Sequence, residues 1–491
     1  MRQTWNVVVA LDPDSKTPIF LQIARAISEA IQLGKLCPGE ALPGTRVMAD
    51  VLNVHRKTIV AAYDELTAQG WIQTEPSKRT FVSSTFPKLP QKEMNRACQM
   101  ELPEFPSYSF QIASTSDSSY TLVPRDVLVF NDGTPDPRLL PTNNLIRAYR
   151  KVLTHHKYSL NYGDPRGQPT LRVELADMLN KGRGLACKPD EVLITRGSQM
   201  ALYMAAQTLI RTGDIVAIEE LSYPPAWQAF EHAGAEILPI PLDEDGLSVE
   251  FLDAISQKKQ LRAVYLTPHH QYPTTVSLPA CRRMKLLELA KDHGFVIIED
   301  DYDHEYHYLG HPILPLASIN HAGNVLYVGS LSKLLTPDFR IGYIVAPKAL
   351  VDSMAALRLL IDRQGDPVLE QTVAELMNSG ELNRHAKKAR KQYQLRRDYL
   401  VKRLTQLEDN VRLTIPSGGL ALWLQFPKVN DMRQLAEYLQ RHGVIISPAE
   451  RFAYQTTSMS AARLGFAALN PEEIEQGITV LEKAIKVVIA A

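Results

Sequence analysis

Four short apolar runs rich in β-branched residues constrain the fold of this chain more than any other feature. They lie at residues 192–195, 215–218, 263–266 and 295–298, and helical segments such as 200–210 and 281–292 separate them. Runs of this kind are typical of strands that are covered on both faces of a sheet. The alternation predicts an α/β fold with a mainly parallel sheet in the part of the chain that begins near residue 128.

Residues 1–84 predict a separate unit of three helices and two strands. Apolar residues recur at helical spacing between residues 19 and 31, and Thr45 can cap a short helix over 46–52. A tight turn at Asn53 leads to a longer helix over 56–69, which Gly70 ends. Two short strands, 71–74 and 79–82, flank a turn at 75–78. This order of elements is typical of a winged helix-turn-helix.

The stretch between these two parts has the composition of a linker. Prolines recur at positions 87, 90, 103, 106 and 124, and residues 114–121 are almost wholly polar. A long irregular segment is better placed between domains than inside one. We therefore expect a winged helix over 1–84, a linker over 85–127 and a second domain over 128–491, with a small α+β subdomain from about residue 381.

The composition of the 491 residues indicates a globular, multidomain protein. Lys and Arg together number 54, as do Asp and Glu, so no overall charge attracts the chain to nucleic acid or to a membrane. The four cysteines lack a C-x-x-C pair, which favours reduced thiols over a disulfide framework or a zinc site. No leader or membrane-spanning run is evident, so we expect a cytoplasmic protein without a metal.

The cations of the predicted winged helix stand where DNA would lie. In a helix-turn-helix the second helix enters the major groove, and the preceding turn and the wing contact phosphates. The alternative is a winged helix used for protein contact, with these cations as ordinary surface charges. The candidate DNA contacts, at the starts of both helices and at the wing tip, are Arg46, Arg56, Lys57, Thr58, Lys78 and Arg79.

Lys333 is the candidate nucleophile of the second part. It follows an apolar run on a short loop with Ser330 and Ser332, a position that presents one amine to a carbonyl cofactor. Arg340 lies seven residues further on and can pair with an anionic group of that cofactor. Nearer the C-terminus, Arg463 offers a guanidinium fork for a carboxylate. A solvated lysine and a surface salt bridge are the alternatives for these residues taken singly.

Polar groups that follow other strands fit the same small molecule. Gly197, Ser198 and Gln199 follow a strand and open a helix, where free N–H groups favour a phosphate. Tyr223 follows the next strand and can stack on an aromatic ring, while Asp300 ends a strand at the edge where α/β proteins bind ligands. Turn packing and a solvated strand end are the alternatives, but the shared edge favours one site.

The N-terminal motifs resemble the GntR-type DNA-binding domain. The strings that carry the resemblance are Leu-Pro-Gly-Thr-Arg-Val-Met-Ala at 42–49, Val-His-Arg-Lys-Thr-Ile at 54–59, Tyr-Asp-Glu-Leu at 63–66 and Gly-Trp at 70–71. Two features depart from that family: His55 stands where a serine is usual, and Pro-Ser-Lys-Arg at 76–79 replaces a glycine-rich wing tip. The resemblance implies a double-stranded operator DNA as partner.

Residues 130–491 resemble the fold-type I aminotransferases, which bind pyridoxal 5′-phosphate (PLP). The resemblance implies catalytic roles for Lys333, which forms an aldimine with PLP, for Asp300, which pairs with the pyridinium, and for Tyr302, which contacts the phenolic oxygen. It also implies that Arg463 takes a ligand carboxylate and that the protein is a homodimer. The further PLP contacts that it implies are Gly197, Ser198, Gln199, Tyr223, Ser330, Ser332, Arg340 and, across the dimer, Tyr162.

One motif departs from the aminotransferase pattern. In Pro-His-His-Gln-Tyr-Pro-Thr-Thr at 268–275, Tyr272 replaces the usual asparagine and Thr275 the usual glycine. The phenolic oxygen of PLP therefore relies on Tyr302, and His270 is a further candidate contact nearby.

The fusion of the two parts resembles the MocR subfamily of GntR-type bacterial transcriptional regulators. The resemblance implies a PLP-dependent, DNA-binding regulator that senses an amino-bearing metabolite, or PLP itself, through aldimine chemistry at Lys333. The alternative is an aminotransferase that acts on an amino acid and carries an accessory DNA-binding domain. A fold that has lost the cofactor is disfavoured, because Lys333, Asp300 and Arg340 are all retained.

Overall fold

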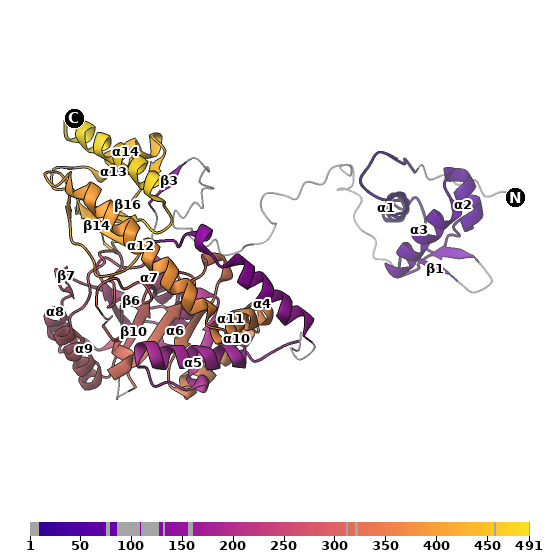
Figure 1. Cartoon of the computed structure of the whole chain (residues 1–491). Coiled ribbons are helices and arrows are strands. Elements are labelled where there is room, and N and C mark those ends of the chain that lie inside the picture. The colour runs from indigo at the N-terminus through magenta and orange to yellow at the C-terminus, as the bar shows by residue number, and fades with distance from the viewer. Residues whose placement is uncertain are drawn as a thin grey trace. The chain divides into compact units, whose positions relative to one another are not determined.

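A computed structural model describes residues 9–74, 79–85, 109, 127–130, 133–155, 161–310, 313–319, 323–455 and 458–490. The chain divides into two compact units, residues 1–119 and 120–491 (Figure 1). Most of the expected linker over 85–127, and the wing tip at 75–78, lie outside the described residues. None of the described helices is long and apolar enough to cross a membrane.

The first unit is a winged helix-turn-helix, which confirms the fold expected from the sequence. Helices α1 and α2 both pack against α3, and side chains such as Ile23, Met48 and Ile59 are completely buried between them. The two strands pair antiparallel, with Ile72 opposite Val82. The elements are α1 (Ile19–Gln32), α2 (Thr45–Leu52), α3 (Arg56–Ala68), β1 (Ile72–Thr74) and β2 (Thr80–Val82).

The start of α2 differs from the prediction. Thr45 is the first helical residue and not the cap, which is Gly44 and makes no side-chain hydrogen bond. Helix α3, in contrast, has a side-chain cap, because Nδ1 of His55 accepts a hydrogen bond from the Lys57 amide at 3.1 Å. The histidine that departs from the family pattern therefore performs the capping role expected of a serine.

The second unit is built on a mixed, mainly parallel sheet, as predicted. In the described part of this unit, seven strands lie in the order β4-β12-β11-β10-β9-β5-β6. Only β12 in this sheet runs antiparallel to its neighbours, so the other six strands share one direction. The strands are β4 (Val192–Thr195), β5 (Ile215–Glu219), β6 (Glu236–Ile240), β9 (Leu261–Leu266), β10 (Val296–Asp301), β11 (Val325–Ser330) and β12 (Gly342–Val345).

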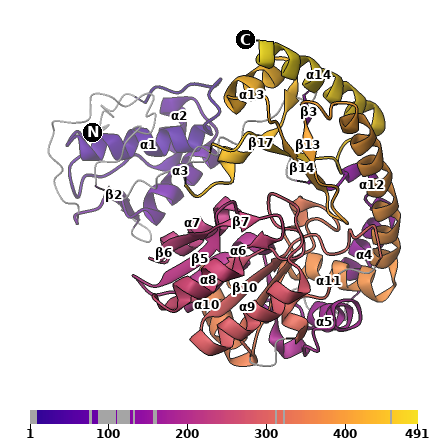
Figure 2. The same cartoon turned by 90° about the vertical axis from the view of Figure 1, so that its left-hand side faces the viewer.

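Helices cover both faces of this sheet (Figures 1 and 2). Side chains of β4 alternate between two separate cores: Leu193 packs with α6, α7 and α10, whereas Val192 and Ile194 pack with α5 and α11. Further along the sheet, α8 and α9 cover the second face. These helices are α5 (Pro169–Arg183), α6 (Gly197–Leu209), α7 (Pro224–His232), α8 (Val249–Ser256), α9 (Ala280–His293), α10 (Lys348–Ile361) and α11 (Pro367–Asn378), and α4 (Thr142–Thr154) packs against α11.

The C-terminal part forms the smaller α+β subdomain that the sequence predicts. Its four-stranded sheet has the order β13-β14-β17-β16, with α12, α13 and α14 around its core. The sequence did not predict that β3 (Leu128–Val129), at the start of the unit, pairs in parallel with β15 (Val444–Ile445). The elements are α12 (Glu381–Thr405), β13 (Arg412–Leu413), β14 (Ala421–Gln425), α13 (Met432–Arg441), β16 (Ser447–Pro448), β17 (Ala461–Gly465) and α14 (Pro471–Ala490); a short hairpin, β7 (Leu242–Asp243) and β8 (Gly246–Leu247), lies in the larger part.

Candidate functional site

The shared direction of six strands places the sequence-predicted loops at one edge of the large sheet. The segments that follow β4, β5, β9, β10 and β11 all leave the sheet at their carboxyl ends. These segments carry the predicted glycine-serine pair, Tyr223, His270, Tyr302 and Lys333. Ligands of open α/β sheets bind at this edge, so the topology brings together residues that are far apart in sequence.

Lys333 is half-buried in the turn after β11. The Leu331 amide donates to the Ile341 carbonyl at 2.9 Å, and the hydroxyl of Tyr306 donates to the Lys333 carbonyl at 2.9 Å. The amide of Ser332 donates to Oγ of Ser330 at 3.1 Å. These contacts fix the backbone of the turn, so the lysine side chain starts from a defined position.

Asp300, at the end of β10, is almost completely buried. Its Oδ2 accepts a hydrogen bond from the hydroxyl of Tyr265 at 3.1 Å, while its Oδ1 has no hydrogen-bond partner among the described residues. Burial raises the pKa of Asp300 to about 7, and the positive charge of Lys333 acts in the opposite direction. The carboxyl therefore has an unused acceptor atom beside the predicted lysine.

The N-terminus of α6 and Arg340 form a second part of the site. Gly197 opens the helix with a φ of +76°, and a Cβ built there would lie 3.0 Å from the guanidinium of Arg340. The Nη2 group of Arg340 donates to the carbonyl of Arg196 at 3.1 Å. Ser198 is half-buried and Gln199 is exposed on the first turn. A helix N-terminus beside a guanidinium is a favourable environment for a phosphate.

Aromatic rings and Arg463 form a third part. Tyr223 caps α7 and packs edge-on against Tyr272 with a centroid distance of 5.4 Å. The buried guanidinium of Arg463 lies 4.8 Å from the Tyr272 centroid, donates to the Pro273 carbonyl at 2.8 Å and donates to the Tyr302 hydroxyl at 3.3 Å. Burial raises the pKa of Tyr302 well above its usual range, so its hydroxyl keeps its proton at neutral pH.

The side chain of His270 is held by a carboxylate. Its Nδ1 lies 2.8 Å from Oδ1 of Asp303, and both side chains are buried. Tyr162, expected in the site of a partner subunit, is 74% exposed, and the guanidinium of Arg363 lies 4.1 Å from its ring. In a single chain it is therefore a surface side chain.

The predicted DNA contacts lie at the ends of α2 and α3 that the helix-turn-helix brings together. Nε of Arg56 lies 3.4 Å from Oγ1 of Thr45, which joins the first residues of the two helices. The side chains of Arg46, Lys57 and Arg79 are exposed, as is that of Arg56, and Thr58 is half-buried. Lys78 lies outside the described residues.

The sequence did not identify Tyr265 as part of the site. Tyr265 pairs with Ile298 across β9 and β10, and this register brings its hydroxyl to Asp300. Only the register of two strands reveals this contact, because the residues are 35 positions apart. The alternation of side-chain direction along β9 indicates at most which of its side chains share one face of the sheet.

The residues at this edge fit PLP. Asp300 has an unused buried oxygen for the pyridine nitrogen, and Ser332 has a buried Oγ without a hydrogen-bond partner among the described residues. Gly197 leaves space in front of Arg340 that a Cβ would fill. A phosphorylated pyridine aldehyde needs three groups: an acid for the pyridine nitrogen, a hydroxyl with a helix N-terminus for the phosphate, and a lysine for the aldehyde.

Comparison with known proteins agrees with both units. Residues 125–481 match the family model "Aminotransferase class I and II", and residues 20–82 match "Bacterial regulatory proteins, gntR family". The chain is 28% identical to the probable rhizopine catabolism regulatory protein MocR of Rhizobium meliloti, over 97% of this chain and 96% of that protein. It is 30% identical to the HTH-type transcriptional regulator TauR of Rhodobacter capsulatus, over 97% and 98% of the two chains.

The second unit also matches solved structures. The kynurenine aminotransferase of Pyrococcus horikoshii, crystallised with PMP, superposes with a TM-score of 0.69 and 32% identity, covering 74% of this chain and 91% of that one. The chain belongs to the aminotransferase class I and II family, and its gntR-family domain and full-length relatives make it a MocR-type transcriptional regulator.

Proposed function

We propose that this regulator binds PLP at Lys333 and uses it to sense an amino-bearing metabolite, or PLP itself, and so controls the binding of its winged helices to operator DNA. The observation that carries the proposal is the position of Lys333 beside a buried Asp300 with an unused carboxylate oxygen. As a regulator of transcription it would act in the cytoplasm, as a homodimer.

Each part of the site has a role toward the cofactor. Asp300 would hold the pyridine nitrogen, Tyr302 with His270 nearby would hold the phenolic oxygen, and Tyr223 would contact the ring. When bound, PLP supplies an aldehyde carbon that amines attack reversibly. The groups that would hold its phosphate are Gly197, Ser198, Gln199, Ser330, Ser332, Arg340 and the Tyr162 of a second copy of this chain.

The electrostatics of Asp300 suit a cationic pyridine nitrogen. A buried carboxylate gains most from an adjacent positive charge, because burial otherwise penalises its ionised form. The pKa of about 7 in the chain alone would therefore fall when a pyridinium lies against Oδ1. Asp300 would then hold the proton on that nitrogen and orient the ring.

Arg463 is the group that would select among amines. Its guanidinium lies at the same end of the site as Tyr302, and its planar fork matches a carboxylate. An amino acid would thus meet Lys333 with its amine and Arg463 with its carboxylate. Lys333 would also be available as a base for a proton at that amine.

The rival function is an aminotransferase with an accessory DNA-binding domain. Retention of Lys333, Asp300 and Tyr302 favours it, since these positions suffice for proton transfer at the amine carbon. The full-length relatives are named as regulators, and this supports the regulatory function instead.

A titration of the full-length, PLP-loaded protein with a panel of amino acids separates the two functions. Absorbance would be followed with and without a 2-keto acid, together with affinity for a duplex that the protein itself selects from a random-sequence pool. A lasting spectral change that shifts DNA affinity supports the amino-metabolite sensor. Steady turnover with keto acid and constant DNA affinity would contradict regulation by the amine. If the panel has no effect, DNA affinity must differ between PLP-loaded and PLP-free protein for PLP itself to be the signal.

A further inference from the structure

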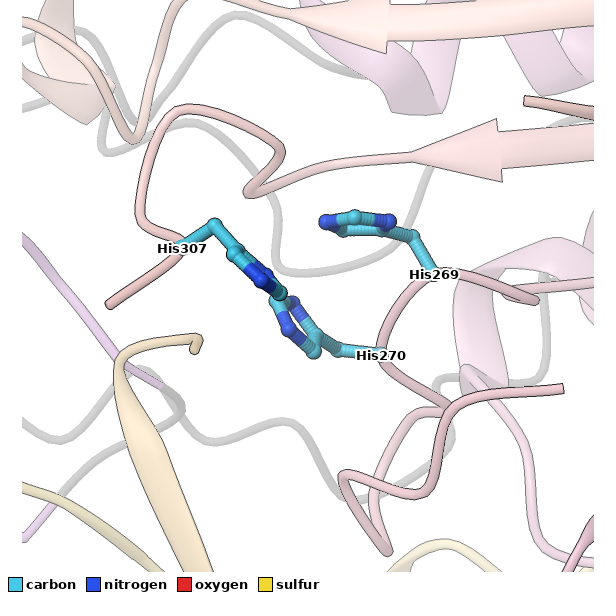
Figure 3. Close-up of side chains that lie close together, drawn as sticks. All are labelled: His269, His270 and His307. Carbon is cyan, nitrogen blue, oxygen red and sulfur yellow. The ribbon is translucent and has the colours of Figure 1, made fainter. Parts of the chain in front are cut away.

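Three histidine rings gather beside the site, and only one of them, His270, has a role in the proposed binding of PLP. His269 and His270 lie in the loop after β9, and His307 lies in the loop after β10 (Figure 3). One ring nitrogen of each lies within 4.8 Å of those of the other two. The ring centroids of His269 and His270 are 4.4 Å apart, and those of His269 and His307 are 6.0 Å apart.

One nitrogen of each ring is buried without a hydrogen bond among the described residues. Nε2 of His269, Nε2 of His270 and Nδ1 of His307 have no hydrogen-bond partner among the described residues. His269 is 5% exposed and His270 is 1% exposed. A buried polar atom that lacks a partner costs free energy, so these lone pairs require something to bind.

The surroundings hold one of the rings in a fixed orientation. His270 has its Nδ1 on the carboxylate of Asp303 at 2.8 Å, which directs Nε2 away from that contact. Carboxylate–histidine pairs of this kind orient and strengthen metal ligands. Nε2 of His270 is therefore the atom of this ring that can bind a metal.

We propose that His269, His270 and His307 bind one divalent transition-metal ion. Three imidazoles without a thiolate suit Zn²⁺, Cu²⁺, Ni²⁺ or Co²⁺ rather than Mg²⁺ or Ca²⁺. Tetrahedral zinc with bonds of about 2 Å needs its nitrogens roughly 3.4 Å apart, so the nitrogens, now within 4.8 Å of one another, would have to approach by up to about 1.4 Å through side-chain torsions. His307 is half-buried and is the most accessible of the three residues.

The site would lie where the two sheets of the second unit meet. Gly418, just before β14 of the small sheet, forms a β-bridge with His307, and a Cβ at Gly418 would lie 2.9 Å from the ring of His270. Only glycine leaves room for the imidazole at this distance. A metal held by these rings would therefore fix the two loops of the large part against which Gly418 packs.

To test this site, metals are first removed with a chelator from the tag-free, full-length, PLP-loaded protein. Binding of Zn²⁺ is then measured. We expect one ion per chain by calorimetry and elemental analysis. Cu²⁺ loading should give an electron paramagnetic resonance spectrum with hyperfine splitting from histidine nitrogens. His269→Gln and His307→Gln should abolish binding, and Asp303→Asn should weaken it about 10- to 100-fold. His442→Gln removes an exposed histidine that stacks on Tyr438 and should leave binding unchanged.

The outcomes separate a metal from ordinary buried water. Failure to bind one equivalent of Zn²⁺ or Cu²⁺, or binding that survives both His269→Gln and His307→Gln, would overturn the proposal. If a variant does not fold, the wild-type spectrum still decides, because a Cu²⁺ signal without nitrogen splitting excludes histidine ligands. An equal loss in His442→Gln would also reject the assignment.

Discussion

At the scale of single residues, the proposed site is characterised by buried ionisable side chains. Asp300 and Glu219 are both buried carboxyls at the same edge of the large sheet, and burial raises the pKa of each, to about 7 and about 8. Asp300 keeps an oxygen for a ligand, whereas Glu219 accepts hydrogen bonds from the amide and hydroxyl of Thr267 at 3.2 Å each. The first carboxyl is thus available for the proposed binding of PLP, and the second stabilises the loop after β9.

Lys333→Ala should abolish covalent attachment of PLP. No other amine is predicted to reach the same carbon, so the visible absorbance of the loaded protein should disappear. Intact-mass analysis after borohydride reduction should show an adduct in the wild type and none in the variant. Lys348→Ala is the matched control, because that lysine is 54% exposed on α10 and pairs with Asp352. Retention of the adduct in Lys333→Ala would assign it to another lysine.

Glu219→Gln should change how stability depends on pH. The pKa of about 8 in the folded state lies above the ordinary value of 4.5, so between these values the folded state holds a proton that the unfolded state has lost. The stability that this group contributes is complete below pH 4.5 and falls as pH rises to 8, by up to roughly 5 kcal/mol. The variant should match the wild type near pH 5 and melt at a higher temperature at pH 9.

The control for this prediction is Glu236→Gln, an exposed carboxylate on β6 of the same sheet. Melting temperatures of both variants and the wild type are compared at the two pH values. A constant difference between Glu219→Gln and the wild type across this range would show that Glu219 is ionised in the folded protein.

At the scale of elements, two close contacts position the proposed binding groups, one in the aminotransferase-like unit and one in the winged helix. The first is between β12 and α6: a Cβ at Gly342 would lie 2.5 Å from the carbonyl carbon of Gly197. The second is between α2 and α3, where Tyr63 donates to the Pro43 carbonyl at 2.8 Å and holds the turn before α2. Both contacts set the position of a helix N-terminus that faces a proposed anion.

Gly342→Ala should displace the N-terminus of α6. The backbone of Gly197 cannot yield without moving the helix, and overpacking of this kind costs about 1 to 3 kcal/mol. We expect a lower melting temperature and weaker PLP binding, measured by calorimetry. Gly182→Ala, on α5, is the control, because a Cβ there meets nothing within 4 Å. It should be neutral or stabilising by up to about 1 kcal/mol. Unchanged PLP affinity in Gly342→Ala would contradict the proposed phosphate site.

Arg56→Ala should weaken DNA binding by about 1 to 3 kcal/mol if this arginine reads a base. Its side chain is exposed at the start of α3, and Thr45 on α2 lies beside it. Arg25→Ala removes the same charge from an exposed position in the middle of α1 and should have a smaller effect. Fluorescence anisotropy at several salt concentrations distinguishes base from phosphate contact. Equal losses in the two variants would mean that only bulk charge matters.

The sequence predicted the elements well and the contacts between them only in part. The runs at 192–195 and 263–266 became β4 and the larger part of β9, because buried parallel strands have a strong apolar signal. The pairing of β3 with β15 joins residues more than 300 positions apart, and two-residue strands have no periodicity.

The sequence indicates single candidate residues of the site, but it does not indicate which side chains cluster in space. Lys333, Asp300 and Arg340 stand out because each follows or ends a recognisable element. His269 and His307 belong to irregular loops, and their approach depends on the order of β9 and β10 in the sheet. A histidine pair after one strand and a third histidine after a later strand is the available signal in the sequence, whereas the spacing of the cysteines indicates no metal site.

At the scale of the whole molecule, a second copy would be required to complete the proposed site. The ring of Tyr162 lies 4.1 Å from the guanidinium of Arg363, just beyond α10, and the last turn of α10 carries Leu360, 85% exposed, and Leu359, 51% exposed. A patch of large apolar side chains at the surface is typical of an interface between proteins. Leu360 precedes Arg363 by three residues, so we expect one contact with a second copy to deliver Tyr162 to the partner and to bury these leucines.

Leu360→Lys should therefore dissociate the dimer, since it introduces a charge into that contact. Sedimentation velocity should show a shift toward monomer, and PLP affinity should fall with it because Tyr162 no longer reaches the second site. Met284→Lys, which alters a 58% exposed side chain on α9, is the control and should sediment as the wild type does. A dimer that persists in Leu360→Lys would place the interface elsewhere.

The hydrogen bonds of Arg463 affect how a ligand carboxylate would bind to this guanidinium. The strand of Arg463 belongs to the small sheet, in register with Trp423 and Ser447, while its guanidinium is held by Pro273 and Tyr302 of the larger part. A carboxylate that binds both Nη groups of this guanidinium would replace these two contacts. Recognition of such a carboxylate would then be an exchange rather than a simple addition. The same exchange would loosen one tie between the two sheets, so we expect binding to change how the two parts of the second unit meet.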